Sequence, residues 1–120
     1  MYLISFFILV FLLGGIPFGF LISRYWLKID IRQQGSGNIG MTNVIRVGGK
    51  LPGLLTFVLD LGKGSVAVLL AKNFIPALVI DIETQKIFLS LAGVIVVCGH
   101  VFLFFCVSRE EKEFQLYLEC

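Results

Sequence analysis

Long apolar runs separated by polar segments are the main feature of this 120-residue chain. The first run covers residues 3–23 and contains no charged residue, the second covers 51–71, and the third covers 86–107. About 20 apolar residues suffice to cross the hydrocarbon core of a bilayer as a helix. The pattern therefore predicts three transmembrane helices, which we expect to form part of a larger helical bundle.

The first run contains Pro17 among Gly14, Gly15 and Gly19. Proline has no backbone N–H and disturbs the hydrogen bonding of a helix, so we expect a bend near the end of this segment. The alternative for the run is a cleaved signal peptide. That alternative is disfavoured because no basic residue precedes the run and no A-x-A cleavage site follows it.

The composition supports a membrane protein. Hydrophobic residues make up 58% of the chain and charged residues 15%, with a mean hydropathy of +0.95, whereas soluble domains carry about 25% charged residues. We therefore predict an all-α integral membrane protein whose main environment is the lipid bilayer. A formal net charge of +2 without a basic patch argues against nucleic acid as a partner.

The chain has three cysteines, Cys98, Cys106 and Cys120, which lack CxxC spacing, and a single histidine. This pattern predicts neither a disulfide framework nor a metal site. We interpret Cys98 and Cys106 as small apolar residues that fill space along a helix.

Residues 24–50 form the polar loop between the first two apolar runs. Its basic residues outnumber its one acid, Asp30, and are Arg24, Lys28, Arg32, Arg46 and Lys50. Loops rich in Lys and Arg stay on the cytoplasmic side of a membrane. We therefore expect this loop in the cytoplasm, the N-terminus outside, and the end of the third run on the cytoplasmic face.

The loop contains GSGNIGMTNVIR over residues 35–46, which satisfies the dinucleotide fingerprint G-x-G-x-x-G. Asp60 follows the last of these glycines at about the sequence distance at which the fingerprint has its ribose-binding carboxylate. A dinucleotide site, however, needs a strand before the glycines and a sheet built around them. Apolar membrane segments flank this loop, so a nucleotide-binding oxidoreductase is a distant alternative.

Glycine-rich turns bind phosphate without that fold, because successive backbone N–H groups form an anion-binding concavity and glycine permits positive φ. Short polar side chains at Ser36, Asn38, Thr42 and Asn43 add donors, and Arg46 can pair with phosphate oxygens. We therefore predict a phosphate cradle. The alternative is a polar interhelical loop of turn residues.

Asp60 and Lys63 interrupt the second run three residues apart, so they share a helix face and can pair. An ionised side chain at a helix centre costs about 2.5–3.5 kcal/mol on insertion scales, which indicates a function or a buried partner. A self-neutralised structural pair is the alternative, and Gly62 and Gly64 would permit close helix approach. His100, at the end of the third run, is by position alone an interfacial or core residue more often than a catalyst.

Four segments together resemble the first half of the bacterial acyl-phosphate:glycerol-3-phosphate acyltransferases, the PlsY family. They are GGIPFGFLIS, DIRQQGSGNIGMTNVIR, LDLGKG, and GH followed by V-F. The resemblance covers residues 1 to about 102. Met41 stands where the family usually has alanine, a change that removes no polar group.

The resemblance implies transfer of an acyl group from acyl phosphate to the 1-hydroxyl of glycerol 3-phosphate, which yields lysophosphatidic acid for phospholipid biosynthesis. It implies a multi-pass protein of the bacterial plasma membrane and no cofactor. The phosphate-binding residues would be Ser36, Gly37, Asn38, Thr42, Asn43 and Arg46. The catalytic set would be Asp60, Lys63 and His100, with His100 positioning substrate.

The resemblance ends where the family has a basic glycine-rich motif, K-F-x-G-G-K-G, and this chain has FFCVSREEKEFQLYLEC. Codons for Ser108 to Gln115, read from one base earlier, can spell K-G-G-K-G-V-S. We therefore expect residues from about 103 or 107 to 120 to be out of frame and without selected function. The chain would then be a truncated N-terminal half with little or no activity alone; otherwise it is a small membrane subunit or transporter component.

Overall fold

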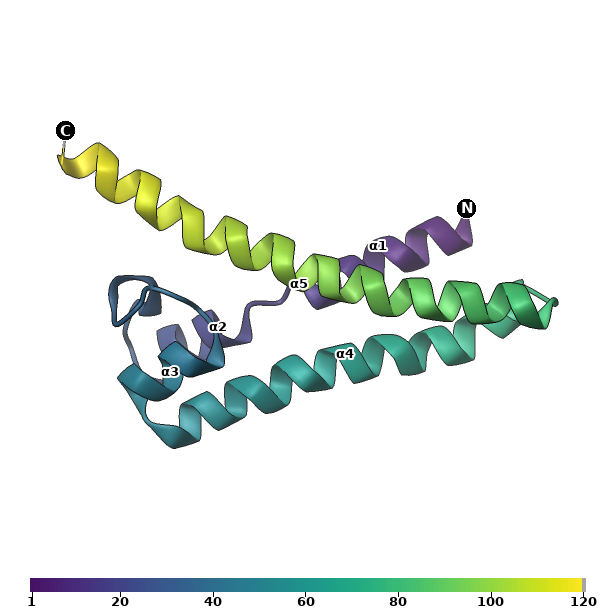
Figure 1. Cartoon of the computed structure of the whole chain (residues 1–120), viewed down its shortest axis with the longest axis horizontal. Helices are drawn as coiled ribbons and strands as arrows, with labels where there is room; N and C mark the ends of the chain where they lie inside the picture. Colours follow the sequence, from purple (N-terminus) through teal and green to yellow (C-terminus); the bar gives the residue numbers. More distant parts are fainter. Residues whose placement is uncertain (120) are drawn as a thin grey trace. The chain divides into compact units, whose positions relative to one another are not determined.

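The structure, a computed structural model, describes residues 1–119, and all regular elements in that range are helices. These are α1 (Tyr2–Gly14), α2 (Phe18–Tyr25), the 3₁₀ helix η1 (Ile31–Gln33), α3 (Met41–Gly48), α4 (Lys50–Leu78) and α5 (Ile82–Glu119), shown in Figure 1. The predicted all-α class is confirmed. No strand occurs among these residues, which removes the sheet that a dinucleotide-binding fold requires.

Two helices are long and apolar enough to cross a membrane, namely α4 and the part of α5 from Ile82 to Arg109. The helices α1 and α2 are bent by 47° relative to each other, and they form a third candidate span only if the pair is counted as one span. Two to three candidate spans agree with an all-α membrane protein.

The first apolar run is interrupted where a single helix over 3–23 was expected. The interruption lies between the end of α1 at Gly14 and the start of α2 at Phe18. Pro17 occupies the N-cap position of α2 with φ −87° and ψ 76°, outside the helical region. Because proline cannot donate a backbone hydrogen bond, the helix ends before it and a new one begins after it.

The helices α4 and α5 extend beyond the ranges 51–71 and 86–107 that the apolar pattern predicts. Pro76 lies beyond the predicted range 51–71 and yet inside α4, which ends at Leu78. Membrane helices tolerate an internal proline because side chains and neighbouring segments satisfy the freed carbonyl. The helix α5 continues past residue 107, where Arg109 and Glu113 form an i,i+4 ion pair, and Arg, Glu and Lys are good helix formers. Cys120 lies outside the described residues.

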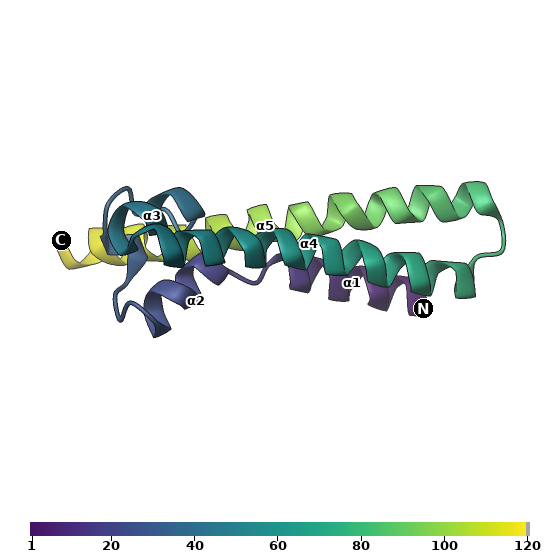
Figure 2. The same cartoon turned by 90° about the horizontal axis from the view of Figure 1, so that it is seen from below.

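The chain divides into two compact units. Unit 1 contains residues 1–16 and 61–102, and therefore α1, the second part of α4 and the first part of α5. Its two long segments run antiparallel and are joined by residues 79–81 (Figures 1 and 2). A buried apolar cluster holds the unit together: Phe6, Val10, Ala67, Ala71, Ile75, Ala92 and Val96.

Close packing of α1 against α5 in unit 1 depends on two glycines. A Cβ added at Gly14 would collide with the Val96 carbonyl, and one added at Gly99 would collide with the Phe11 carbonyl. By contrast, Gly62 and Gly64 have no such neighbour within 4 Å. The close approach expected at Gly62 and Gly64 therefore occurs at Gly14 and Gly99, because those two glycines face the neighbouring backbone.

Unit 2 contains residues 17–60 and the chain from Leu103 onward. It comprises α2, η1, α3, the start of α4 and the end of α5. Its small core consists of Ile31, Ile39 and Val44, against which Phe20, Val47, Phe104 and Val107 pack. This core anchors the glycine-rich loop that precedes α3.

Candidate functional site

The glycine-rich loop of unit 2 uses left-handed backbone conformations at two of its three fingerprint glycines. Gly35 has φ 59° and Gly37 has φ 72°. A side chain at Gly37 would also meet the Arg32 carbonyl. Glycine alone adopts these torsions without a steric penalty. Gly40 instead has an extended conformation and is the N-cap residue of α3.

The Asn43 side chain organises this loop from within. It is 2% exposed, and its Oδ1 accepts a hydrogen bond from the Ser36 N–H at 3.0 Å. Its Nδ2 donates to the carbonyls of Gln34 at 2.9 Å and Asn38 at 2.8 Å. Asn43 therefore shapes the loop and has little hydrogen-bonding capacity left for a ligand.

Three backbone N–H groups of the glycine-rich loop have acceptors inside the loop. The Ser36 N–H bonds Asn43 Oδ1, the Gly37 N–H bonds the Gln34 carbonyl, and the Gly40 N–H bonds Asn38 Oδ1. These three N–H groups therefore hold the loop in shape. The phosphate cradle stays a prediction.

Side chains rather than these N–H groups are the donors that the loop presents. Ser36, Asn38, Thr42 and Arg46 are all exposed. Thr42 and Arg46 lie four residues apart on α3 and so share one face of that helix. They form a basic and hydroxyl-bearing surface next to the loop.

A cavity of about 300 Å³ opens beside the loop within unit 2. Its polar lining comes from Ser36 and Asn38 in the loop and from Ser108 and Arg109 in α5, and its apolar lining from Phe104 and Phe105. Thr42 and Arg46 are not among the described residues that line it. The sequence prediction missed the α5 residues, since their position beside the loop follows only from the tertiary structure.

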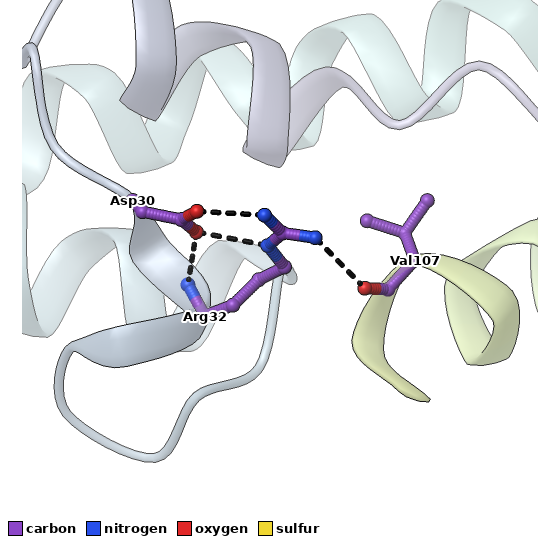
Figure 3. Close-up of polar contacts among 3 residues, drawn as sticks. All are labelled: Asp30, Arg32 and Val107. Atoms are coloured by element: carbon purple, nitrogen blue, oxygen red, sulfur yellow. Dashed lines mark hydrogen bonds and ion pairs between the residues drawn. The ribbon is translucent and has the colours of Figure 1, made fainter. Parts of the chain in front are cut away.

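Arg32 forms an ion pair with Asp30 in its own segment and a hydrogen bond with α5, as Figure 3 shows. Arg32 donates from Nε and Nη2 to the two carboxylate oxygens of Asp30 at 2.9 and 2.7 Å, and from Nη1 to the Val107 carbonyl at 3.4 Å. Its guanidinium also lies 4.8 Å from the centre of the Phe20 ring. This contact places the lining residues of α5 next to the loop.

The hydrogen bond from the Arg32 side chain holds the pKa of Asp30 below its ordinary value. Burial of the carboxylate acts in the opposite direction, and the Arg32 N–H adds a further lowering contribution. Asp30 therefore stays ionised at neutral pH. The sequence D-I-R contained the signal for this pair, namely opposite charges two residues apart.

Unit 1 contains a second polar cluster, centred on Lys63. The Lys63 side chain is 6% exposed in α4, and its Nζ donates to the Ile16 carbonyl at 2.8 Å. Nζ also lies 2.9 Å from His100 Nδ1 in α5. The Ile16 carbonyl precedes Pro17, where the helical pattern of backbone bonds is broken. Lys63 thus satisfies a carbonyl that the broken helix leaves without a regular helical partner.

The donor and acceptor roles in the contact between Lys63 and His100 depend on the imidazole tautomer. When Lys63 is protonated it has donors and no acceptor, so Nδ1 accepts and the imidazole proton lies on Nε2. His100 Nε2–H is consequently a hydrogen-bond donor in this state. Asp60 lies one turn before Lys63 on α4 and is partly buried; its pairing with Lys63 stays a prediction.

The family model described as "Glycerol-3-phosphate acyltransferase" matches residues 4–112. The match extends beyond residue 102, where the resemblance was expected to end, and the reading-frame hypothesis stays a prediction. No solved structure matches the chain.

Curated proteins named glycerol-3-phosphate acyltransferase are similar to this chain. The one from Jannaschia sp. is 46% identical over 111 residues, which is 92% of this chain and 50% of the relative. The one from Exiguobacterium sibiricum is 44% identical over 110 residues, 92% of this chain and 49% of the relative. The one from Desulforamulus reducens is 59% identical over 63 residues, 52% of this chain and 32% of the relative. The chain thus spans about half the length of the curated relatives it matches most extensively.

Proposed function

Because the chain belongs to the glycerol-3-phosphate acyltransferase family, we propose that it takes part in acyl transfer from acyl phosphate to the 1-hydroxyl of glycerol 3-phosphate. The bond between the acyl carbon and the phosphate oxygen breaks, and a bond from that carbon to the glycerol oxygen forms. The hydroxyl proton is released and inorganic phosphate leaves. The products are lysophosphatidic acid and phosphate.

The observation that carries this proposal is the set of exposed donors on the glycine-rich loop and on α3, namely Ser36, Asn38, Thr42 and Arg46. Ser36 and Asn38 also line the cavity of about 300 Å³ in unit 2, together with the rings of Phe104 and Phe105. Arg and hydroxyl donors suit phosphate oxygens, and charge-assisted hydrogen bonds of this kind are strong. A phosphate bound to a short carbon chain has the same division into anionic and less polar parts.

Each loop residue has a distinct role in this proposal. Ser36, Asn38, Thr42 and Arg46 contact phosphate through their side chains, whereas Gly37 and Asn43 hold the loop in shape. The helix α3 begins at Met41, directly after the loop, so the positive end of its dipole favours an anion there.

The buried cluster of unit 1 has a positioning role. Lys63 lies against His100 and holds its ring in place, and His100 positions the substrate. Asp60 balances the charge of Lys63 in the apolar surroundings. Acyl phosphate has a good leaving group, so orientation and charge stabilisation can supply much of the catalysis without an enzyme nucleophile.

The positive-inside pattern supports a location of the loop in the cytoplasm of a bacterial cell, with the N-terminus outside the plasma membrane. Glycerol 3-phosphate is a soluble cytoplasmic metabolite in this scheme, and the acyl donor is membrane-bound. Both would reach the same polar face of the protein.

The test is binding of glycerol 3-phosphate to the detergent-purified chain by isothermal titration calorimetry. We expect binding, competition by inorganic phosphate, and no binding of glycerol, which lacks the phosphate. Ser36→Ala and Arg46→Gln should each weaken binding about tenfold, because a hydrogen bond to a charged group contributes about 1.5–3 kcal/mol. Lys50→Gln is the control, since Lys50 is exposed like Arg46 and is not among the proposed phosphate contacts.

Equal binding of glycerol and glycerol 3-phosphate would contradict a phosphate site. So would unchanged affinity in both Ser36→Ala and Arg46→Gln. Lysophosphatidic acid formation from acyl phosphate, measured in the same preparation, tests the separate expectation that this chain alone has little activity.

A further inference from the structure

A second cavity lies in unit 1, near the connection between α4 and α5. It has a volume of about 130 Å³. Ala71, Ile75, Pro76 and Leu89 form most of its apolar lining, and two lysines, Lys72 and Lys86, lie among the lining residues. None of the predicted site residues lines it, so it has no role in the proposed acyl transfer.

Lys72 is an unusual residue for its position. It lies in a helix that is long and apolar enough to span a membrane, and its neighbours Leu69 and Phe74 are exposed on the helix surface. The six residues from Lys72 to Leu78 correspond to about 9 Å along a helix, so a long side chain can reach the headgroup region. No described residue forms an ion pair with it.

Lys86 supplies a second cation at the same cavity. Its Nζ lies 2.7 Å from Glu83 Oε1, and the two side chains are 65% and 77% exposed. An exposed pair of this kind is worth about 0–1 kcal/mol. A phosphate can therefore replace Glu83 as the partner of Lys86 at little cost.

Hydrogen bonds hold the end of this hairpin in place. Gln85 Nε2 donates to the Val79 carbonyl at 2.6 Å. Asp81 Oδ2 accepts from the Thr84 N–H at 2.8 Å, as an N-cap residue of α5 does. Asp81 is thus engaged in capping, although it and Glu83 are acidic groups at this end of the unit.

We propose that this cavity binds the phosphodiester headgroup of an anionic phospholipid of the surrounding bilayer. Lys72 and Lys86 contact the phosphate oxygens, and an acyl chain lies along Ile75, Pro76 and Leu89. Lysine ammonium groups pair with phosphate oxygens through charge-assisted hydrogen bonds, which are stronger than hydrogen bonds between neutral groups. The cavity is too small for a whole lipid, so only the headgroup phosphate and the first carbons of a chain enter it.

The test is native mass spectrometry of the detergent-purified chain with phosphatidylglycerol and, separately, phosphatidylcholine. We expect preferential retention of phosphatidylglycerol. Lys72→Gln and Lys86→Gln should each lower its retention about fivefold, because a basic residue near an anionic lipid surface is worth about 1 kcal/mol. Lys72→Arg should retain binding. Lys50→Gln, which removes an equal charge from the start of the same helix outside the cavity, should have no effect.

Three results would overturn the proposal: equal retention of the two lipids, an equal loss in Lys50→Gln, or unchanged retention in both cavity variants. Displacement of the lipid by millimolar inorganic phosphate would assign the site to free phosphate instead. Far-ultraviolet circular dichroism of each variant shows that a loss of lipid is not a loss of helix.

Discussion

Lys63 in unit 1 and Asn43 in unit 2 are both buried polar side chains, 6% and 2% exposed respectively, but their partners come from different distances along the chain. Asn43 bonds Ser36, Gln34, Asn38 and Ile31, all within 12 residues of it in the sequence. Lys63 bonds Ile16 and lies against His100, 47 and 37 residues away.

The two side chains differ in whether their hydrogen-bond partners are neighbours in the sequence or are brought together only by the tertiary structure. A buried polar group without partners is costly. In unit 2 the chain satisfies the group with its own neighbouring backbone, whereas in unit 1 three segments must assemble first. Perturbing Asn43 should therefore act on one loop, and perturbing the contacts of unit 1 should act on the whole unit.

The largest effect is expected from filling the close contacts between α1 and α5. Gly14→Val and Gly99→Val should each lower the stability of unit 1 by about 3 kcal/mol, because overpacking typically costs about 1–3 kcal/mol and the colliding atoms here are backbone. The measurement is the apparent free energy of unfolding in sodium dodecyl sulfate, followed by circular dichroism. Gly93→Ala, where no atom lies within 4 Å, is the control and should stabilise α5 slightly.

Asn43→Ala should destabilise the loop by about 2 kcal/mol, since it leaves the Ser36 N–H and the Asn38 carbonyl without their partner at about 1 kcal/mol each, whereas the Gln34 carbonyl keeps the Gly37 N–H. Hydrogen exchange read by mass spectrometry should accelerate over residues 31–43 and stay unchanged in unit 1. Acceleration spread evenly over both units would contradict a local role for Asn43.

Lys63→Met should lower the stability of unit 1 by about 2 kcal/mol, because a hydrogen bond to a charged group contributes about 1.5–3 kcal/mol and apolar packing offsets part of the loss. Exchange should accelerate in residues 1–16, 61–78 and 82–102 together. The matched control, Lys50→Met, changes an exposed lysine of the same helix. If Lys63→Met affected only α4, the three-segment interpretation would be wrong.

The smallest effect is a pH dependence in unit 2. Because the pKa of Asp30 is lowered in the folded protein, its contribution is fully present above the ordinary pKa of about 3.9 and is lost as the pH falls through the lower folded pKa. Asp30→Asn should cost about 1 kcal/mol at pH 6. Melting curves at pH 6 and pH 3 should show a smaller acid-induced loss in Asp30→Asn than in the unchanged chain.

Much of the architecture follows from the order of apolar and polar residues. The apolar runs over 51–71 and 86–107 mark the two long helices, and Pro17 marks the interruption of the first run. Composition determines the all-α membrane class, because only helices and closed barrels satisfy backbone hydrogen bonds inside a bilayer. The apolar pattern did not predict that α4 continues to Leu78 or that α5 continues past residue 107. An internal proline and a charged segment do not by themselves stop a helix.

The candidate site also has some features that follow from the sequence and others that depend on the tertiary structure. The sequence alone determined the family, the glycines with positive φ at positions 35 and 37, and the presence of Lys63 and His100 in apolar helices. The tertiary structure decided which groups meet: Lys63 with His100 and the Ile16 carbonyl, Arg32 with Val107, and Ser108 and Arg109 with the loop. Local spacing determines torsions and helix faces, but contacts across tens of residues depend on how the helices pack.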